Sequence, residues 1–470
     1  MSTLVMKFGG TSVGSAEAIG QTVDIVQEYI QDWECLVVVV SAMSGATDAL
    51  AQGAQAAASG DDQAYRAIVA GLRTRHHEVV DTLLDRGNEH IRLLATVDRY
   101  IDELAAFCYS IHILGEVTTR AMDAVTSLGE RINARVVAAV LHQRGVRGKA
   151  VDATELIITD DKFQNAAPLM DATRARVSDR LSRELDDGIV LIVTGFIGAT
   201  EEGVTTTLGR GGSDYTAAIL GDCLDADEIW TWTDVDGVMT ADPRIAPDAR
   251  VIPQLSYSEV SELAYFGAKV LHPKTILPTI RRGIPLWVKN TFNPACPGTR
   301  IAREAESANG EVKAVTAIEG MSMVTVEGRG MMGVPGIAAR TFSAVASQGA
   351  SVLMISQASS EQSICFIIPT QTSPLVVSAI EEEMALELAR RDVDRVWSLD
   401  DVVIVTIVGA GMRDASGIAA RVFSALSRGN INIIAIAQGS SECSISLVVA
   451  ADAATDAVRQ IHTEVIIDGG

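Results

Sequence analysis

In the larger, N-terminal part of the chain, apolar residues follow two alternating patterns. Continuous apolar runs occur at 36–40 and 189–193, and a similar run at 228–232 starts at Glu228 and is interrupted by Thr231, as is typical of strands buried on both faces of a parallel sheet. Residues 16–30 carry apolar side chains at helical spacing, and 62–143 are predicted to be mainly helical. This alternation predicts an α/β fold, with a mainly parallel sheet between two layers of helices.

The C-terminal part contains an internal repeat. Gly336-Ile337-Ala338-Ala339-Arg340 returns as Gly417-Ile418-Ala419-Ala420-Arg421, an offset of 81 residues. The same offset relates further pairs, namely Thr325 and Thr406, Phe342 and Phe423, and Gln357 and Gln438. One constant offset over this span indicates two copies of one structural unit. Each copy is predicted to form a ferredoxin-like βαββαβ unit, ending in a strand.

A change in composition separates these two parts. The segment 293–299 is rich in turn-forming residues, and 304–310 is small and polar, so a linker belongs here. We therefore predict a first domain at 1–295, a linker at 296–313 and two repeat units at 314–398 and 399–470.

Charge and cysteine content narrow the functional classes. The chain has 470 residues, of which 48% are hydrophobic, and a net charge of −22. Such an acidic protein is repelled by nucleic acid and by anionic lipid, so we expect neither as a partner. The six cysteines are scattered, without metal-ligand spacing, and predict no metal site. The first residues do not resemble a signal peptide, which predicts a cytoplasmic protein.

Four motifs carry candidate chemistry. Lys7-Phe8-Gly9-Gly10-Thr11-Ser12 begins in the last residues of a predicted strand, Leu4–Phe8, and its cation and turn amides suit phosphoryl oxygens; a plain strand–turn–helix is the alternative. The others are Thr207–Tyr215, with Arg210 among glycines before a helix, Trp232–Arg244, with carboxylates after a strand, and Phe266–Pro273, with Lys269. Ligands bind at such carboxyl ends of strands in open α/β sheets.

In this order, the four motifs resemble those of aspartate kinases in the amino acid kinase family. Ser127-Leu128-Gly129-Glu130 resembles the family's Gly-Glu element, and the segment from Ser41 to Thr47 resembles its serine-threonine loop. The repeat is similar to the paired ACT domains of these enzymes. The resemblance covers nearly the whole chain. It departs at Met239, where many members carry tyrosine.

The resemblance implies an α/β amino acid kinase domain followed by two ACT domains. It also implies ATP-dependent phosphorylation of the L-aspartate side chain to 4-phospho-L-aspartate, the first step of lysine, threonine and methionine biosynthesis. Lys7 and Asp214 would be catalytic. The aspartate site would comprise Ser41, Thr47, Glu130, Arg210 and Ser213. The ATP site would comprise Lys7, Gly9, Gly10, Thr233, Asp234, Met239, Arg244, Lys269 and Val270. Mg²⁺ would arrive on ATP rather than in a protein cage.

Regulation is expected from the ACT pair. Gln357 and Gln438 lie in segments that resemble those of threonine-sensitive aspartate kinases, which implies inhibition by L-threonine rather than L-lysine. An amide donates and accepts hydrogen bonds but offers lysine no carboxylate. Alternatively, both glutamines simply end strands where the ACT units meet. Such pairing implies a homodimer or larger assembly. A catalytically silent amino-acid sensor and a kinase with another carboxylate acceptor are the competing functions.

Overall fold

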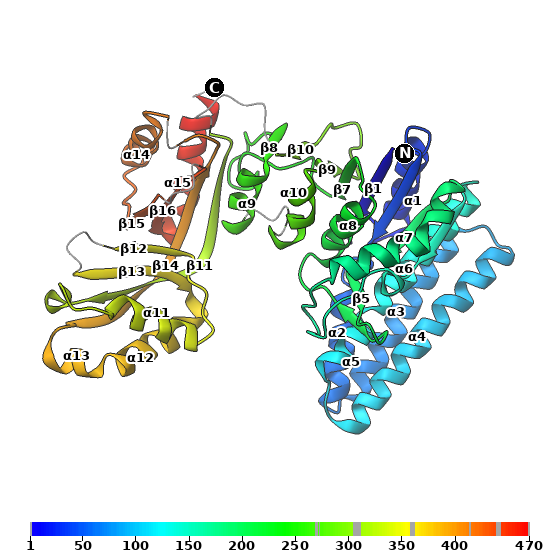
Figure 1. Ribbon diagram of the computed structural model, residues 1–470, viewed down its shortest axis with the longest axis horizontal. Coiled ribbons are helices and arrows are strands. Elements are labelled where there is room, and N and C mark those ends of the chain that lie inside the picture. Colours follow the sequence, from blue (N-terminus) through cyan, green and yellow to red (C-terminus); the bar gives the residue numbers. More distant parts are fainter. Residues whose placement is uncertain are drawn as a thin grey trace. The chain divides into compact units, whose positions relative to one another are not determined.

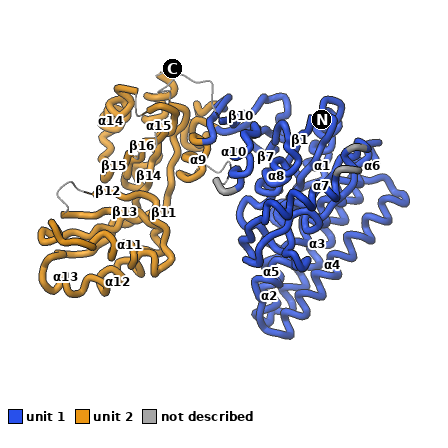
Figure 2. Tube along the Cα trace, in the orientation of Figure 1, with its two compact units in different colours: residues 1–238, 251–257, 270–305 blue, residues 239–250, 258–269, 306–470 orange. Residues whose placement is uncertain are grey.

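The computed structural model describes residues 2–267, 271, 273–303, 312–357, 362–412, 415–438 and 443–468. It divides into two compact units, coloured separately in Figure 2. The first comprises Met1–Val238, Val251–Tyr257 and Val270–Ala305, and the second comprises Met239–Arg250, Ser258–Lys269 and Glu306–Gly470. Among the described residues, none of the helices combines the length and apolar character that crossing a membrane requires.

The described part of the first unit is built on an eight-stranded sheet with the order β3-β4-β2-β1-β7-β9-β10-β8; Figure 1 labels β1, β7, β8, β9 and β10 of this sheet. Its strands are β1 (Thr3–Phe8), β2 (Cys35–Val40), β3 (Gly148–Val151), β4 (Val190–Thr194), β7 (Glu228–Thr233), β8 (Gln254–Ser256), β9 (Leu286–Asn290) and β10 (Thr299–Ala302). Neighbours from β3 to β9 are parallel, whereas β10 is antiparallel to β9. The mainly parallel sheet is therefore confirmed.

Helices cover both faces of this sheet. Leu4, Met6 and Phe8 of β1 share a buried core with α1 (Ala16–Tyr29) and α6 (Leu128–Gln143). Helices α7 (Met170–Asp186) and α8 (Gly212–Cys223) pack against the sheet as well, α8 against β1 and β7. Because side chains alternate along a strand, Lys7 points away from the face occupied by Leu4, Met6 and Phe8.

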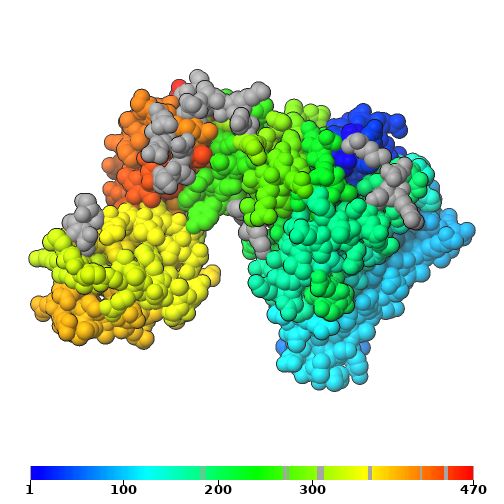
Figure 3. Space-filling view, viewed as in Figure 1, coloured from blue at the N-terminus to red at the C-terminus, as the bar shows by residue number. Residues whose placement is uncertain are grey.

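A group of helices departs from the sheet, drawn light blue to cyan in Figures 1 and 3. It consists of α3 (Asp62–Leu83) and α4 (Asn88–Leu114), with the shorter α2 (Ala46–Ala58) and α5 (Thr119–Thr126). Asp61 accepts a hydrogen bond from the Ala64 amide and so begins α3. This confirms the predicted helical segment. The unit is completed by the hairpin β5 (Ile197–Ala199) and β6 (Thr205–Thr207) and by α10 (Leu277–Arg282), whereas α9 (Tyr257–Tyr265) belongs to the second unit from Ser258 on.

In the described residues of the second unit, an antiparallel six-stranded sheet has the order β12-β13-β11-β14-β16-β15. Its strands are β11 (Ala314–Glu327), β12 (Met354–Gln357), β13 (Ser363–Pro369), β14 (Arg395–Val408), β15 (Ala435–Ala437) and β16 (Ser444–Ala450). Its helices are α11 (Ile337–Ser347), α12 (Ser373–Glu383), α13 (Ala385–Arg390), α14 (Ile418–Arg428) and α15 (Ala454–His462).

The two repeat copies share the long strands β11 and β14. The first half of β11 pairs with the second half of β14, with register shifts between Ile318 and Met323. The second copy therefore takes its fourth strand from Ala314–Ile318, which precedes the first copy in sequence. We expected that strand at the C-terminus, but α15 is followed there by the helical segment Thr463–Ile467.

The two repeat copies also have similar backbone geometry where their first helices begin. Gly336 and Gly417 precede α11 and α14 with φ of 93° and 95°. This left-handed conformation favours glycine, and each helix then begins with a buried isoleucine, Ile337 or Ile418. The sequence identity at these positions thus reflects one helix start used twice.

Two segments that lie within the first predicted domain in sequence belong to the second unit. Ala241 and Ala246 are buried in the same core as Val403 and Val405 of β14. The Thr240 hydroxyl is hydrogen-bonded to His462 Nε2 of α15 at 2.9 Å. The predicted contiguous boundary at residue 295 thus differs from the observed division, because these side chains complete the core of the second repeat copy.

Candidate active site

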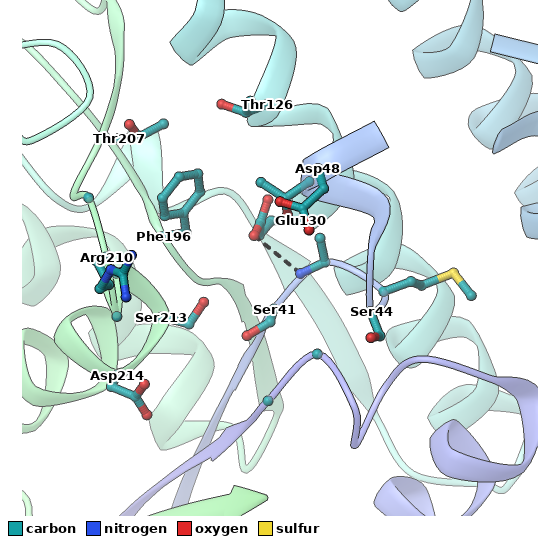
Figure 4. Close-up of a pocket in the computed structure, with 18 of the residues that line it drawn as sticks. Ser41, Ser44, Asp48, Thr126, Glu130, Phe196, Thr207, Arg210, Ser213 and Asp214 are labelled. Atoms are coloured by element: carbon teal, nitrogen blue, oxygen red, sulfur yellow. Dashed lines mark hydrogen bonds between the residues drawn. The ribbon is translucent and has the colours of Figure 1, made fainter. Parts of the chain in front are cut away.

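A cavity of about 770 Å³ opens where strands β1, β2, β4 and β7 of the first unit end (Figure 4). Its lining includes most of the residues that the sequence singled out, namely Lys7, Gly9, Gly10, Ser41, Thr47, Glu130, Arg210, Ser213, Asp214, Thr233 and Asp234. These come from motifs far apart in the chain. Their convergence follows from the topology, since parallel strands bring their carboxyl ends to one edge of the sheet.

The cation at the base of the cavity is held by a carboxylate. Lys7 Nζ lies 2.8 Å from Asp214 Oδ1, and the two side chains are 10% and 19% exposed. Asp214 Oδ1 makes no hydrogen bond of regular geometry, so we regard the contact as an ion pair. Lys7 extends from β1 and Asp214 from the first turn of α8, which packs on β1. The pairing fixes the lysine without removing it from the cavity.

The two glycines after Lys7 have different roles. The Gly9 amide donates to the Trp232 carbonyl at 3.0 Å, so it is not free for a phosphoryl oxygen, contrary to our expectation for both glycine amides. The reason is the neighbouring strand β7, whose end lies beside this turn. A Cβ on Gly10 would lie 3.3 Å from the Ala42 carbonyl, so glycine at this position lets the segment 41–47 approach.

Glu130, in the first turn of α6, is almost completely buried, with 3% exposure. One carboxylate oxygen, Oε1, accepts a hydrogen bond from the Ala42 amide at 3.2 Å, the dashed line in Figure 4. The other, Oε2, has no hydrogen-bond partner among the described residues. Burial raises the Glu130 pKa to about 8, because desolvation disfavours the charged form. A cationic group in the cavity would restore the carboxylate.

The second basic residue of the cavity lies on a loop. Arg210 is exposed, and Figure 4 shows it across the cavity from Glu130. It follows Gly209 and precedes Gly211, whose φ angles are 80° and 71°. Gly211 is the N-cap of α8, so the helix begins at Gly212, and Ser213 and Asp214 lie in its first turn.

Hydrogen bonds to its backbone fix the position of the segment from Ser41 to Thr47. The Ser41 carbonyl accepts a hydrogen bond from Asn133 Nδ2 at 2.7 Å, and the Ser44 amide donates to the Gly10 carbonyl at 3.1 Å. Arg75 of α3 donates to the Ser44 carbonyl at 2.8 Å. Ser41 and Thr47 therefore line the cavity from a constrained backbone.

The predicted nucleotide residues are distributed over both units. Thr233 and Asp234 line the cavity of the first unit. Met239 and Arg244 belong to the second unit and are not among the lining residues, and Arg244 pairs with Asp242 at 2.6 Å. Lys269 and Val270 lie outside the described residues. The assignment of these four to a nucleotide site stays a prediction.

The predicted effector residues lie in the second unit at equivalent positions of the repeat. Gln357 ends β12, Gln438 follows β15, and both are exposed. Their role stays a prediction as well.

The sequence did not single out Phe196, Asp123 and Gln164, which also line the cavity. Phe196 lies two residues after Thr194, the carboxyl end of β4, and has φ of 69°, an uncommon conformation for a bulky side chain. Its place after a buried parallel strand was an available signal. Asp123 and Gln164 carry no such signal, because only the fold brings them here.

Among the residues that the structure describes, there is no group of three or more His, Cys, Asp or Glu side chains that could cage a metal ion. The carboxylates that line the cavity, those of Asp48, Asp123, Glu130, Asp214 and Asp234, form no such group. This donor set suits a divalent cation that keeps most of its ligands on phosphates and water.

Comparison with known proteins assigns this fold and cavity to a class. The model of the amino acid kinase family matches residues 2–290, and an ACT domain model matches 324–384 and 405–465. The chain therefore belongs to the amino acid kinase family.

The relatives that it matches over nearly its whole length are aspartokinases. It is 38% identical over 469 residues to bifunctional aspartokinase/homoserine dehydrogenase 1 of Arabidopsis thaliana, covering 98% of this chain and 51% of that protein. It is 34% identical to aspartokinase 1 of the same plant, covering 98% and 79%. The chain thus spans about half the length of the bifunctional relatives.

A solved structure gives the same result. Escherichia coli aspartokinase III in complex with aspartate and ADP matches with a TM-score of 0.81 at 29% identity, covering 98% of this chain and 99% of that one. The aspartate kinase of Clostridium acetobutylicum matches with a TM-score of 0.81 at 26% identity, covering 98% and 100%. The predicted fold, a kinase domain followed by ACT domains, is confirmed.

Proposed function

We propose that this protein is an aspartate kinase, which transfers the γ-phosphoryl group of ATP to the side-chain carboxylate of L-aspartate and forms 4-phospho-L-aspartate. The observation that carries the proposal is the Glu130 oxygen Oε2, which has no hydrogen-bond partner among the described residues and lies in the cavity that also holds Lys7 and Arg210. A buried anion facing a basic site fits an amino acid, whose ammonium and carboxylates need partners of both signs.

The reaction needs charge stabilisation more than proton transfer. The acceptor carboxylate has an ordinary pKa of about 3.9, so it is ionised at neutral pH without a general base. The obstacle is the approach of one anion to another, which positioned cations relieve. The carboxylate oxygen forms a bond to the γ-phosphorus while the bond from that phosphorus to the ADP oxygen breaks.

Each charged group of the cavity then has a role. Lys7, fixed by Asp214 at 2.8 Å, stabilises the transferring phosphoryl group, together with the Gly10 amide. Glu130 accepts the substrate α-ammonium. Arg210 binds a substrate carboxylate in a two-pronged contact, beside Ser213, Ser41 and Thr47.

Nucleotide binding completes the proposal. Thr233 and Asp234 contribute to the ATP site, with Met239, Arg244, Lys269 and Val270 assigned by resemblance. Mg²⁺ bound to the ATP phosphates would neutralise part of their charge, with Asp214 or Asp234 as the proposed carboxylate partner among those that line the cavity.

Resemblance also supports a cytoplasmic enzyme at the start of lysine, threonine and methionine biosynthesis, a homodimer or larger assembly through its ACT domains, and feedback inhibition by L-threonine. L-lysine is the alternative effector; an aspartokinase III structure from Escherichia coli contains lysine and aspartate.

The test is an ADP-release assay with L-aspartate and L-glutamate as acceptors, coupled to hydroxylamine trapping of the acyl phosphate. We expect ADP and hydroxamate in equal amounts with aspartate. ADP release with glutamate alone would assign another acceptor. No acyl phosphate with any amino acid would favour a catalytically silent sensor.

A further inference from the structure

Asp123, in α5, is a buried carboxylate that the proposed reaction does not use. It is 1% exposed, and it lines the cavity without being one of the groups assigned to substrate. No ion pair is recorded for it within the described ranges, so its charge is balanced by hydrogen bonds alone. Burial raises its pKa, against the opposing effect of those hydrogen bonds. A buried acid without a cation needs a reason to be there.

Its hydrogen bonds all go to two segments of the cavity wall. The Thr207 amide donates to Oδ2 at 2.9 Å, and the Thr207 hydroxyl donates to Oδ1 at 2.8 Å. The backbone amide of Gln164 donates to both carboxylate oxygens, at 3.1 Å to Oδ1 and 3.0 Å to Oδ2. One carboxylate thus joins α5 to the end of β6 and to the turn at Gln164.

These two segments support the loop that carries Arg210. Thr207 is the last residue of β6, three positions before Arg210. The Ala166 amide donates to the Thr207 carbonyl at 2.9 Å. A Cβ on Gly209 would lie 3.0 Å from Asn165 Oδ1 and 3.1 Å from the Gln164 carbonyl, so the turn forms a wall directly against the glycine loop.

Arg210 itself has no recorded side-chain hydrogen bond or ion pair within the described ranges, so its direction depends on its backbone. Glu130 is fixed by α6, which follows α5 after Ser127. Asp123 therefore links the helix pair that carries the proposed ammonium acceptor to the loop that carries the proposed carboxylate binder.

We propose that Asp123 is a positioning residue for the amino-acid acceptor, holding Arg210 at a set distance from Glu130 through Thr207 and Gln164. The inference rests on the proposed function of this cavity. The hydrogen bonds leave Asp123 no free role in proton transfer. In Asp123→Asn, an NH₂ group would replace one carboxylate oxygen and would face the donors of Thr207 and Gln164. One N–H group would then be left without an acceptor.

The experiment compares Asp123→Asn and Thr207→Val with wild type in steady-state assays that vary aspartate and ATP separately. We expect KM for aspartate to rise about tenfold in Asp123→Asn, less in Thr207→Val, and KM for ATP to change less than about twofold. A misplacement of about 1 Å can cost on the order of 100-fold in rate, so a smaller shift of the loop gives a measurable effect. The double variant should be less than additive, because both changes break the same link.

Asp222→Asn is the matched control. Asp222 lies near the other end of α8 and pairs with Arg174 at 3.0 Å and with Arg282 at 2.5 Å, so its loss should lower stability while leaving KM for aspartate unchanged. Equal changes in both KM values for Asp123→Asn, or no change, would overturn the proposal. If Asp123→Asn does not fold, an unchanged KM for aspartate in Thr207→Val overturns it. If wild type uses another acceptor, the proposed function fails, and KM for that acceptor in the same variants still decides the role of Asp123.

Discussion

Each unit of the molecule buries a glutamate, and the two are treated in opposite ways. Glu259, in the second unit, is 0% exposed. Its Oε2 lies 3.3 Å from Lys313 Nζ, and its Oε1 accepts a hydrogen bond from the Ala410 amide at 2.9 Å. Glu130, in the first unit, has one amide partner and an Oε2 without any among the described residues.

This difference in partners distinguishes a glutamate with a structural role from one that is available to bind a ligand. A carboxylate that the fold itself satisfies joins two elements, here α9 and the strand region at Lys313. A carboxylate left incomplete at the edge of a cavity lowers the stability of the folded chain and is kept only if something else completes it. Both glutamates are buried, so burial does not distinguish them. They differ in whether each carboxylate oxygen has a hydrogen-bond or ion-pair partner among the described residues.

The largest effect should come from breaking the satisfied pair. Glu259→Gln would remove the charge of Glu259 from its contact with the buried Lys313, and breaking a buried ion pair from one side typically costs about 3–5 kcal/mol. We expect the free energy of unfolding, measured by urea denaturation, to fall by that order. Glu262→Gln, which weakens a single hydrogen bond from the Ser444 hydroxyl at 2.7 Å, is the milder control. Wild-type stability in Glu259→Gln would contradict the comparison.

Lys7 extends the comparison to a pair inside the cavity. Lys7→Met removes the cation proposed to stabilise the transferring phosphoryl group, and by analogy with one oxyanion donor the loss is about 2.7–4 kcal/mol, or at least about 100-fold in kcat. Circular dichroism should show a folded protein. Lys149→Met is the control, because Lys149 pairs with Glu184 at 2.7 Å but is 52% exposed. A variant with a tenth of wild-type kcat would remove Lys7 from the mechanism.

Glu130→Gln should separate binding from stability. We expect KM for aspartate to rise at least about tenfold, since a charge-assisted contact is worth about 1.5–3 kcal/mol, while KM for ATP changes little. Unlike Glu259→Gln, this variant should be more stable than wild type at pH 7.5 without ligand. Equal shifts in both KM values, or lower stability, would make Glu130 a structural residue.

The pH dependence follows from the Glu130 pKa, raised by burial from its ordinary value of 4.5 to about 8. Between these values the folded chain holds a proton that the unfolded chain has released. The stability due to protonated Glu130 is therefore complete below about pH 4.5 and declines as pH rises to about 8. We expect the stability advantage of Glu130→Gln to grow from pH 5 to 8. A constant difference over that range would show that Glu130 does not titrate there.

Much of this site could be predicted from local motifs, because each motif lies where a strand ends or a helix begins. A lysine at the end of a buried strand and glycines before a helix predict Lys7 and Arg210 near one sheet edge, and Asp214 follows from the first turn of α8. Glu130 came from resemblance alone, since Leu128–Gln143 looks like any buried helix.

What the sequence did not predict depends on partners from distant segments. The Gly9 amide is taken by Trp232, a residue of the adjacent strand. Asp123 becomes a link only once Thr207 and Gln164 are brought to it. Ala314–Ile318 and Met239–Arg250 contribute to the second repeat copy through pairing and core contacts. Local pattern cannot assign such partners.

The same distinction gives the smallest prediction, in the second unit. Thr240 and His462 satisfy each other at 2.9 Å, whereas Gln357 and Gln438 are exposed, occupy equivalent positions of the repeat, and have no recorded side-chain hydrogen bond within the described residues. If they contact L-threonine, Gln357→Ala and Gln438→Ala should each raise the threonine concentration for half-inhibition about fivefold, the value of roughly one hydrogen bond.

That titration includes its own controls. Kinetics without threonine should match wild type, because neither glutamine lies in the first unit. Gln348→Ala is the matched variant, since Gln348 is an exposed glutamine of the same unit whose amide donates to the Ser347 hydroxyl at 3.2 Å. Inhibition by lysine but not threonine would contradict the effector. Wild-type inhibition in both variants would leave the two glutamines as strand ends, and an effect in only one would show that the repeat copies, alike in sequence, bind ligand unequally.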